Sequence, residues 1–429
     1  MNILVIGGGG REHALGVRFL EDQKVSKVIV YPGNPGMRFT LGIQVSPASN
    51  FSFEEAFALS KKESVELVVI GPEAPLFQGW VDQFIAEGIP AFGPSKAASF
   101  LEESKIKSKV FMKEAGISTA AFESANSLEQ ATAIIEKNPH WEGHVLKLSG
   151  PALGKGVIVT QSSEEALQAA RDFFKFKPPG IEEGMVIEEK ITGREVSLFY
   201  VCFDEEYRFL ASACDHKRLK DNDEGPNTGG MGAYSPATWI SDSLVETASK
   251  KFVEPTLKLL NQKGTPFRGI LFLGLMLRNE IPYLLEYNVR FGDPETQTFL
   301  PRIEGDFSGL LHAVASGDLE KFKSIQIGEK PIHSVHVVKA SKGYPGLFGE
   351  EIELGKKIEI KGPVETGSTR VYFAGVKEKD GSLYSSGGRV LGLTATAGTV
   401  SETQKLAYQN LGTVSFEGEQ FRNDIGAKR

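Results

Sequence analysis

The sequence predicts an α/β protein that begins with a doubly wound parallel sheet and ends in a small α+β domain. Three observations support this prediction. The chain has 429 residues, enough for about three domains of usual size. Short apolar runs at residues 3–6 and 66–70 each lead into a glycine-containing turn, as parallel strands do before a helix. After Pro301, strand-like runs and helical patterns carry few candidate catalytic residues.

The composition narrows the functional class. A net charge of -7 argues against broad nucleic-acid binding, which needs a basic surface. Cys202 and Cys214 lie in apolar runs, so we expect two core residues and no disulfide framework. No apolar run approaches the ~20 residues of a membrane span, and the chain starts directly with a strand rather than a signal peptide. We therefore expect a cytoplasmic protein that does not associate with membranes.

The first strand leads into a run of four glycines that ends at Gly10, and Arg11 then begins a helix. Backbone N–H groups and the helix dipole at such a turn suit an anion. A dinucleotide fingerprint is not complete here, because Glu12 stands where its third glycine would fall and the second strand, residues 27–30, ends without an acidic residue. An anion-binding loop is one interpretation, and a turn needed only for tight packing is the other.

The strand at residues 66–70 places Glu73 just beyond its carboxyl end, where ligands bind in open α/β sheets. This carboxylate suits sugar hydroxyls, or it serves as a charge at a helix N-terminus. Ser95 is expected to cap a helix over residues 96–100, and a further helix is expected over residues 104–115.

The middle of the chain suggests a flap over polyphosphate. Lys147 lies on a predicted strand at residues 145–148, and a glycine-containing loop at 149–156 leads to a strand at 157–160. The loop is not a G-x-x-x-x-G-K-[ST] motif, because Gly156 follows Lys155 where a hydroxyl residue is needed. A strand at 185–189 ends in two acids, Glu188 and Glu189, and Glu195 is expected just before the strand at 198–203.

Residues 225–232 contain so much glycine, proline and asparagine that a long functional loop is expected. After a helix at 256–261, the apolar runs at 269–277 and 283–285 predict a buried antiparallel hairpin. Glu286 and Asn288, at the end of its second strand, are two residues apart and share a face. One carboxylate and one amide oxygen beside Arg290 suit a Mg²⁺ ion that also binds substrate phosphates, whereas the alternative is a solvated strand end before a turn.

Strands are expected at residues 334–340, 371–376 and 390–396, with a turn at 387–389 and a helix at 401–409.

Nine motifs span nearly the whole chain: GGREHAL at 9–15, GPEAPL at 71–76, FGPSKAA at 92–98, GKGVIV at 154–159, IEE at 187–189, DHKR at 215–218, GPNTGGMGAYSP at 225–236, RFGDPETQ at 290–297 and GGRVL at 387–391. Through these motifs the sequence resembles the glycinamide ribonucleotide synthetase family, the phosphoribosylamine–glycine ligases of the ATP-grasp superfamily.

The resemblance implies a pre-ATP-grasp N-terminal domain at residues 1–103 and a two-lobed ATP-grasp domain at 104–325, with a lid at about 120–192. A C-terminal α+β domain would occupy 326–429. It also implies a ligase of purine biosynthesis that joins 5-phosphoribosylamine and glycine into glycinamide ribonucleotide. ATP is cleaved to ADP and phosphate, because glycine's carboxylate must first become an acyl phosphate, and such catalysis depends on positioning and charge neutralisation.

The same resemblance implies the roles of individual residues. The ATP site would comprise Lys105, Lys147, Gly154, Lys155, Gly156, Glu188, Glu189, Ile191 and Glu195. Glu286 and Asn288 would hold Mg²⁺ or Mn²⁺. The substrates would contact Gly10, Arg11, Glu73, Asn227, Thr228, Gly229 and Arg290, and the catalytic groups would be Asp215, Lys217, Arg290 and Asp293.

Two departures from the family pattern stand out. Leu148, Ser149 and Pro151 replace the usual Ala, Asp and Leu of the lysine strand and loop, and the strand at 269–277 carries no second metal-binding carboxylate.

A formate- or bicarbonate-dependent ATP-grasp ligase of the purine pathway is the alternative function, although it should lack GPNTGGMGAYSP. A dehydrogenase is disfavoured by Glu12 and Tyr31. A catalytically inactive binding protein is disfavoured by the presence of Lys147, Glu286 and Asn288. We expect a monomer.

Overall fold

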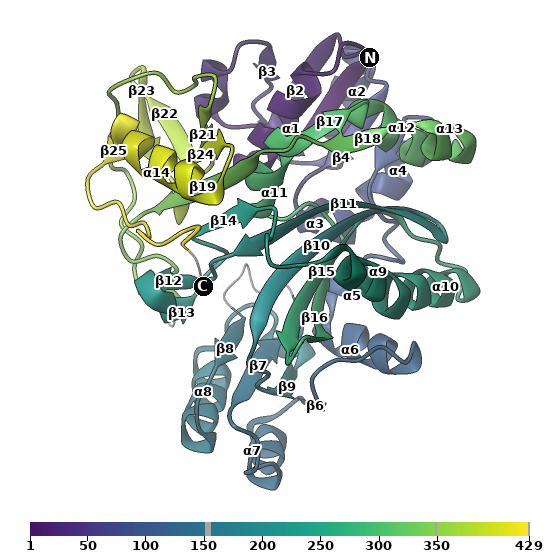
Figure 1. Cartoon of the computed structure of the whole chain (residues 1–429), viewed down its shortest axis with the longest axis vertical. Coiled ribbons are helices and arrows are strands. Elements are labelled where there is room, and N and C mark those ends of the chain that lie inside the picture. The colour runs from purple at the N-terminus through teal and green to yellow at the C-terminus, as the bar shows by residue number, and fades with distance from the viewer. Residues whose placement is uncertain (151–155, 348–349, 428–429) are drawn as a thin grey trace.

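The computed structural model describes residues 1–150, 156–347 and 350–427. Its N-terminal part is a five-stranded parallel sheet in the order β3-β2-β1-β4-β5 (Figure 1). The strands are β1 (Asn2–Gly7), β2 (Lys27–Pro32), β3 (Ile43–Val45), β4 (Leu67–Ile70) and β5 (Ala91–Phe92). The helices of this part are α1 (Gly10–Leu20), α2 (Phe53–Lys62), α3 (Glu73–Phe77) and α4 (Trp80–Ala86). The order reverses at β1, so the predicted doubly wound sheet is confirmed.

The largest sheet has eight strands in the order β16-β15-β10-β11-β14-β19-β24-β21, and neighbouring strands run antiparallel. Its central strands are β10 (Arg194–Phe203), β11 (Glu206–Asp215), β14 (Gly232–Ser235), β15 (Arg268–Arg278) and β16 (Ile281–Asn288). The C-terminal strands β19 (His333–Ala340), β24 (Arg389–Ala397) and β21 (Thr369–Phe373) continue the same sheet. The region after the central domain is therefore joined to it through backbone hydrogen bonds.

Alternation along β15 explains why this sheet is covered on both faces. Leu271, Leu273 and Leu275 belong to one apolar cluster with α10 (Glu254–Gln262), whereas Ile270 and Phe272 pack in a second cluster with α12 (Phe307–Ser316). A strand that is apolar at every position buries both of its faces in this way. The predicted hairpin is confirmed, with Asn279 and Glu280 in left-handed conformations at its turn.

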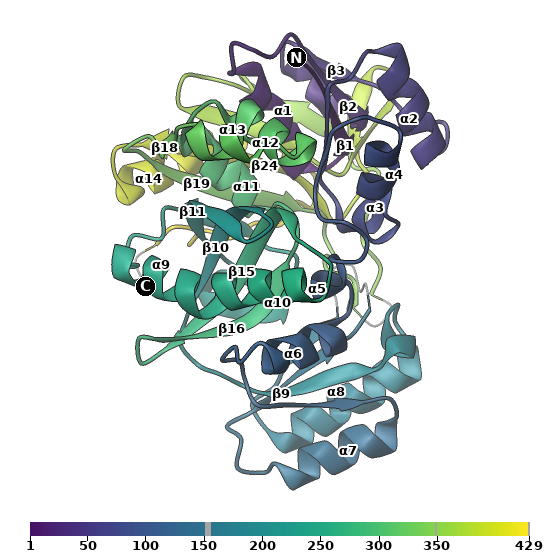
Figure 2. The same cartoon turned by 90° about the vertical axis from the view of Figure 1, so that its right-hand side faces the viewer.

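A separate four-stranded sheet, in the order β6-β9-β7-β8, lies at the bottom of Figure 1 and is called the lid below, after the prediction for this region. Its strands are β6 (Phe122–Ala125), β7 (His144–Leu148), β8 (Val157–Val159) and β9 (Met185–Glu189). Helices α7 (Leu128–Lys137) and α8 (Ser163–Phe176) cover one face of it and share its small core. Figure 2 shows α6 (Lys105–Glu114) between this lid and the body of the molecule.

The remaining elements lie around these sheets. They are α5 (Phe100–Glu103), β12 (Arg218–Lys220), β13 (Glu224–Asn227), α9 (Asp242–Ala248), α11 (Glu295–Phe299), β17 (Ile303–Gly305), α13 (Leu319–Ser324), β18 (Ile327–Glu329), β20 (Ile358–Ile360), β22 (Val376–Lys379), β23 (Ser382–Ser385), α14 (Val400–Asn410) and β25 (Val414–Phe416). Among the described residues, no helix combines the length and apolar character that a membrane span requires. Cys202 and Cys214 are both buried and free, as predicted.

Four local predictions were wrong in detail. Residues 96–99 form a turn rather than a helix, because the Ser99 hydroxyl donates to the Lys96 carbonyl at 2.8 Å and competes with helical bonding. The strand expected at 371–376 is broken at Gly375, where a side chain would lie 2.7 Å from the Arg389 carbonyl. Glu195 lies within β10 rather than before it, and the loop at 225–232 is flanked by short strands that enter it at both ends.

Candidate active site

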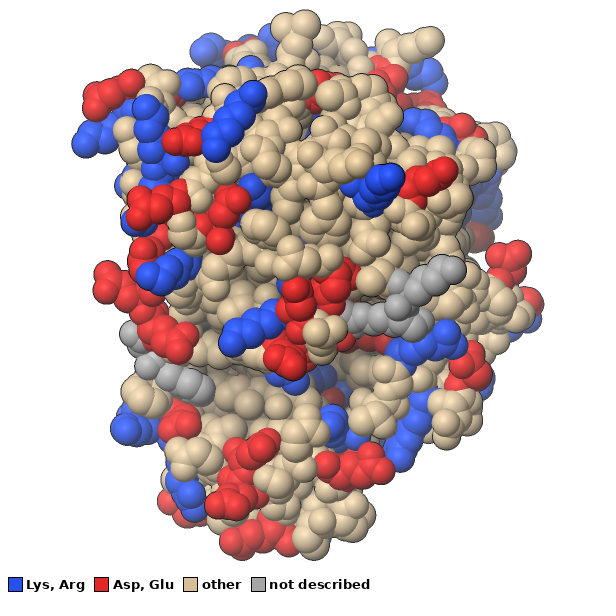
Figure 3. All heavy atoms as spheres, turned by 60° about the vertical axis from the view of Figure 1, so that its left-hand side comes forward, with Lys and Arg blue, Asp and Glu red and all other residues tan. Residues whose placement is uncertain are grey.

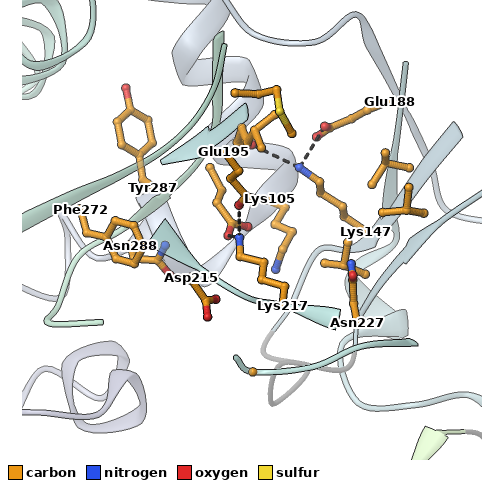
Figure 4. A pocket seen from close by; sticks show the side chains of 18 of the residues that line it. Lys105, Lys147, Glu188, Glu195, Asp215, Lys217, Asn227, Phe272, Tyr287 and Asn288 are labelled. Atoms are coloured by element: carbon orange, nitrogen blue, oxygen red, sulfur yellow. Dashed lines mark hydrogen bonds and ion pairs between the residues drawn. The ribbon is translucent and has the colours of Figure 1, made fainter. Parts of the chain in front are cut away.

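The described residues line a cavity of about 800 Å³ between the lid, α6 and the edge of the large sheet. Figure 4 shows its lysine and acidic side chains converging from these elements. Seventeen of the predicted site residues line it: Glu73, Lys105, Lys147, Gly156, Glu188, Glu189, Ile191, Glu195, Asp215, Lys217, Asn227, Thr228, Gly229, Glu286, Asn288, Arg290 and Asp293. Gly10 and Arg11 are not among its lining residues, and Gly154 and Lys155 lie outside the described residues.

The lid side of the cavity is organised around Glu188, which is 1% exposed. Its two carboxylate oxygens lie 2.9 Å from the Lys147 amine and 3.0 Å from the Lys109 amine. Burial lowers the pKa of Lys109 to about 8, even though Glu188 opposes that effect. Lys147 also donates to the Leu285 carbonyl at 3.2 Å, which ties the lid strand to β16. These contacts hold two cations between the lid and the body of the molecule.

Lys105 is the first residue of α6. Ser149, the residue that follows lid strand β7, holds this end of the helix in place. The Ser149 hydroxyl accepts from the Ile106 N–H at 3.2 Å and lies 3.1 Å from the Ser104 hydroxyl, which caps the same helix. The Lys105 N–H donates to the Ser149 carbonyl at 3.1 Å. Ser149 replaces the family's aspartate, and in this chain it satisfies the otherwise unpaired N–H groups of the helix that carries Lys105.

Lys217 connects two strands of the large sheet. Its amine pairs with Glu195 of β10 and lies 3.6 Å from Oε1 of Glu286 on β16. Burial lowers the pKa of Lys217, but the carboxylates of Glu195, Glu286 and Asp215 outweigh it, so the net shift is upward. Burial likewise raises the pKa of Glu286, but Lys217, Lys147 and Lys105 bring it down to about 2. Glu286 is therefore an ionised carboxylate.

Glu286 and Asn288 fit the divalent cation that the fold implies. They alternate on one strand, opposite Gly274 and Phe272 respectively, and both line the cavity as predicted. An ionised carboxylate beside an amide oxygen is a hard donor set, and Mg²⁺ takes its remaining ligands from water and phosphate. Within the described chain no cluster of three or more His, Cys, Asp or Glu residues could hold a metal by itself. The donor set therefore suits a metal that shares phosphate oxygens.

Two carboxyl groups on the substrate side are shielded from solvent. Asp215 is half-buried with its Oδ1 enclosed, and desolvation together with the nearby Glu295 raises its pKa well above the usual value. Glu295 is 3% exposed, and its pKa is raised mainly by the same burial. Oδ1 of Asp215 has no hydrogen-bond partner and would lie 2.7 Å from a Cβ at Gly230. A glycine is required there because a side chain would collide with this carboxyl group.

The N-terminal side of the cavity is held by Arg290. Its guanidinium lies 2.9 Å from Glu102 and 3.9 Å from Glu73. Arg11 contacts the residue that follows Arg290: it donates to the Phe291 carbonyl at 3.0 Å and pairs with Glu12 at 2.5 Å. Glu12 in turn accepts from the Gly9 N–H at 2.7 Å, so this N–H of the glycine turn is satisfied within the protein. The proposed anion-binding role of the turn remains a prediction.

Among the charged lining residues that sequence reasoning missed are Lys109, Glu102 and Glu295. Lys109 had a usable signal, because it lies four residues after Lys105 and side chains at that spacing share a helix face. Glu102 and Glu295 had none. Glu102 matters because it pairs with Arg290, and Glu295 matters because it is buried. Local residue spacing predicts neither the ion pair nor the burial.

A lid of antiparallel strands closing on a larger sheet, with lysines and carboxylates lining the cavity between them, defines an ATP-grasp ligase. Three family models together match most of the chain. They describe the phosphoribosylglycinamide synthetase N domain at residues 1–102, the ATP-grasp (A) domain at 103–296 and the C domain at 334–428. The chain belongs to the phosphoribosylglycinamide synthetase family.

Individual relatives agree. The chain is 41% identical over 430 residues to the phosphoribosylamine–glycine ligase of Rhizobium meliloti, covering 99% of this chain and 98% of the relative. It superimposes on the crystal structure of the Thermotoga maritima phosphoribosylamine–glycine ligase with a TM-score of 0.79 at 34% identity, covering 99% of this chain and 100% of the other. A biotin carboxylase complex from Campylobacter jejuni, at 16% identity and a TM-score of 0.68 over 99% of this chain and 94% of the other, shares the fold alone.

The predicted fold class and family are thus confirmed, as is the prediction of an ATP-dependent ligase of purine biosynthesis. The formate- or bicarbonate-dependent alternative is not favoured, because the full-length relatives are glycine ligases by name.

Replacing Ser149 with alanine tests the link between the lid and α6. The S149A substitution removes an acceptor for the Ile106 N–H, a loss of about 1 kcal/mol for comparable helix caps. We expect the KM for ATP to rise by roughly fivefold, because Lys105 stands at the loosened end of the helix. Steady-state kinetics with varied ATP measure this change. S162A is the matched control: Ser162 caps α8 on the lid, and no residue of α8 lines the cavity, so the KM for ATP should stay unchanged.

Lys109 predicts a pH dependence of stability. Its pKa is about 8 in the folded protein against 10.5 when exposed, so between these values the unfolded chain binds more protons and folding becomes more favourable as pH rises. Relative to K109M, the wild type should gain about 2 kcal/mol of unfolding free energy between about pH 7.5 and about pH 9.5. Urea unfolding of both proteins at the two pH values measures the gain. A difference that is constant with pH would show that Lys109 is already neutral, or fully charged, throughout that window.

Proposed function

We propose that this cavity carries out the whole ligase reaction, with ATP under the lid, glycine at its centre and 5-phosphoribosylamine on the N-terminal side. The observation that carries the proposal is the convergence of three charge groups on one cavity: Lys109–Glu188–Lys147, Glu195–Lys217–Glu286 and Glu102–Arg290–Glu73. Each group combines cations with carboxylates. The cations suit an anionic substrate, and the carboxylates suit a substrate that carries an amine or hydroxyl groups.

The adenine ring would lie between the lid and the large sheet. Apolar side chains of Val145 and Val157 from the lid and of Met276 and Leu285 from the sheet line that part of the cavity. Glu189 and Ile191 stand at its edge, where the backbone after β9 offers hydrogen bonds to a base. Glu195 would accept hydrogen bonds from the ribose. Its side chain is one-third exposed, so a ribose hydroxyl would compete with Lys217 for it.

The triphosphate would take Lys105 and Lys147 as its cations, together with Gly156 and the neighbouring Gly154 and Lys155. Lys147 now pairs with Glu188 at 2.9 Å, so its amine is held in the cavity before the nucleotide arrives. Glu286 and Asn288 would hold Mg²⁺ or Mn²⁺, which when bound neutralises charge on the phosphates. Glu286 suits this role because surrounding lysines keep it ionised.

In the proposed first step, a glycine carboxylate oxygen attacks the γ-phosphorus of ATP, the bond to the β-phosphate oxygen breaks, and ADP leaves. Lys217 and Arg290 would neutralise the charge that develops on the transferred group. In the second step, the amine nitrogen of phosphoribosylamine attacks the carbonyl carbon of glycyl phosphate, phosphate leaves, and the nitrogen loses a proton. Asp215 would take that proton, because burial makes it a stronger base than an exposed aspartate.

Phosphoribosylamine would bind between Glu73 on one side and the loop of Asn227, Thr228 and Gly229 on the other, and Gly10 and Arg11 would contact it from outside the cavity lining. Thr228 is fixed for such a role, since its hydroxyl donates to the Lys217 carbonyl at 2.9 Å and accepts from the Gly230 N–H at 3.0 Å. Asp293 would orient the amine. Its pKa is raised by burial but is lowered overall by Arg389 and Arg11, so it offers a negative charge.

We also propose a cytoplasmic monomer divided at residues 1–103, 104–325 and 326–429, with its lid at 120–192, that binds neither nucleic acid nor membranes. The net charge of -7 supports the absence of nucleic-acid binding. The face in Figure 3 has basic and acidic side chains interspersed rather than a basic stripe.

Release of phosphate from ATP tests the substrate assignment. We expect release only when glycine and phosphoribosylamine are both present, because glycyl phosphate must be captured by the amine to turn over. Release with formate or bicarbonate in place of glycine would contradict the proposal. A colorimetric phosphate assay with each substrate omitted in turn makes the measurement.

Replacing Glu286 with alanine tests the metal assignment. We expect E286A to lose more than about 100-fold in kcat, because charge on the phosphates is no longer neutralised. Titration with Mn²⁺, followed by its electron paramagnetic resonance signal in the presence of ADP, should show weakened binding. E280A is the matched control: Glu280 is at the exposed tip of the same hairpin and should leave both readouts unchanged. An active E286A enzyme with normal Mn²⁺ binding would refute the assignment.

A further inference from the structure

The cavity depends on residues that do not line it. Arg389 begins β24, in the part of the chain that follows the central domain, and is not among the lining residues of the described cavity. Its Nη1 donates to the Gly229 carbonyl at 2.5 Å and to the Asp293 carbonyl at 2.7 Å. Its Nη2 lies 3.4 Å from Oδ2 of Asp293. One guanidinium thus joins two segments that do line the cavity and that are far apart in sequence.

Tyr344 holds the other side of the same loop. Its hydroxyl oxygen accepts from the Gly229 N–H at 2.9 Å, so both backbone polar groups of Gly229 are bound by C-terminal residues. The Tyr344 ring lies against Gly388, where a Cβ would come within 2.4 Å of it. The turn before Arg389 is fixed in turn, since the Ser341 N–H donates to the Gly388 carbonyl at 2.8 Å and the Ser341 hydroxyl donates to the Gly387 carbonyl at 2.9 Å.

The Asp293 carboxylate is oriented from both ends. Oδ1 accepts from the Gln297 side-chain amide at 2.7 Å, while Oδ2 faces Arg389. The Gln297 carbonyl accepts from the Thr394 hydroxyl at 3.1 Å, and Thr394 also belongs to β24. A single C-terminal strand therefore sets the position of Asp293 through two routes.

We propose that Arg389 and Tyr344 are positioning residues that assemble the phosphoribosylamine half of the cavity by fixing Gly229 and Asp293. This inference rests on the proposed roles of those two residues in binding phosphoribosylamine. It assigns a specific task to the C-terminal region, which would complete the sugar-amine side of the cavity. Arg389 suits the task because a planar guanidinium can satisfy two carbonyls and a carboxylate at once, which a lysine amine cannot match in geometry.

The test compares binding of the two halves separately, using ADP for the nucleotide side and the product glycinamide ribonucleotide for the other. In R389Q, calorimetry should show product affinity lowered by about tenfold or more, since hydrogen bonds to a charged group are lost, with ADP affinity changed by less than about twofold. R389K should restore part of the product affinity. Y344F should weaken product binding by about threefold, because it removes one neutral acceptor.

R370Q provides the matched control. Arg370 is on the neighbouring strand β21 and pairs with Glu365, away from the cavity, so its removal should leave both affinities unchanged. Thermal unfolding of every variant shows that the protein remains folded. Unchanged product affinity in R389Q would overturn the proposal, as would an equal loss of ADP and product affinity, which would indicate a general structural role.

D293N separates this inference from the proposed function on which it rests. If D293N weakens product binding and R389Q does not, the assignment of Asp293 stands and the positioning role of Arg389 fails. If neither variant weakens product binding, the proposed location of phosphoribosylamine itself is wrong.

Discussion

The structure depends on keeping ionised groups paired in a partly desolvated cavity. Charges taken out of water are costly unless each finds an opposite charge. Lys217 illustrates the constraint, because it reaches Glu195 on β10 and Glu286 on β16 from its position beyond the end of β11. Those strands must be in register for one amine to face both carboxylates. The arrangement keeps Glu286 negative while leaving the cavity rich in cations for an anionic nucleotide.

The lid and the C-terminal region constrain opposite ends of this cavity. On the lid side, Glu188 holds Lys109 of α6 and Lys147 of β7 together, so the lid is attached to the body through charge as well as through the chain. On the other side, β24 continues the large sheet and brings Arg389 to Gly229 and Asp293. A family that joins two substrates at the cost of ATP needs both constraints, because activation and capture must occur in one protected space.

The structure explains how Ser149 can stand where the family pattern has an aspartate. A serine in place of aspartate still offers an oxygen to the N-terminus of α6, and the nearby Ser104 shares that task. It lacks the negative charge that would favour a helix N-terminus and would also attract Lys105. The substitution thus preserves the hydrogen bond. Pro151 lies outside the described residues, whereas Leu148 is buried in the core of the lid.

The sequence by itself determined the strand–turn–helix order of the N-terminal sheet, the hairpin at 269–288 and the shared face of Glu286 and Asn288. These features depend on apolar periodicity and on the two-residue repeat of a strand, which are local properties. Tertiary structure decided which charges meet. Glu188 with Lys109, Arg290 with Glu102, and Arg389 with Asp293 are separated by tens to hundreds of residues, and the periodicity of one segment says nothing about the partner that another segment presents. Only the packing of the sheets against each other, and the burial that it imposes, selected those pairs.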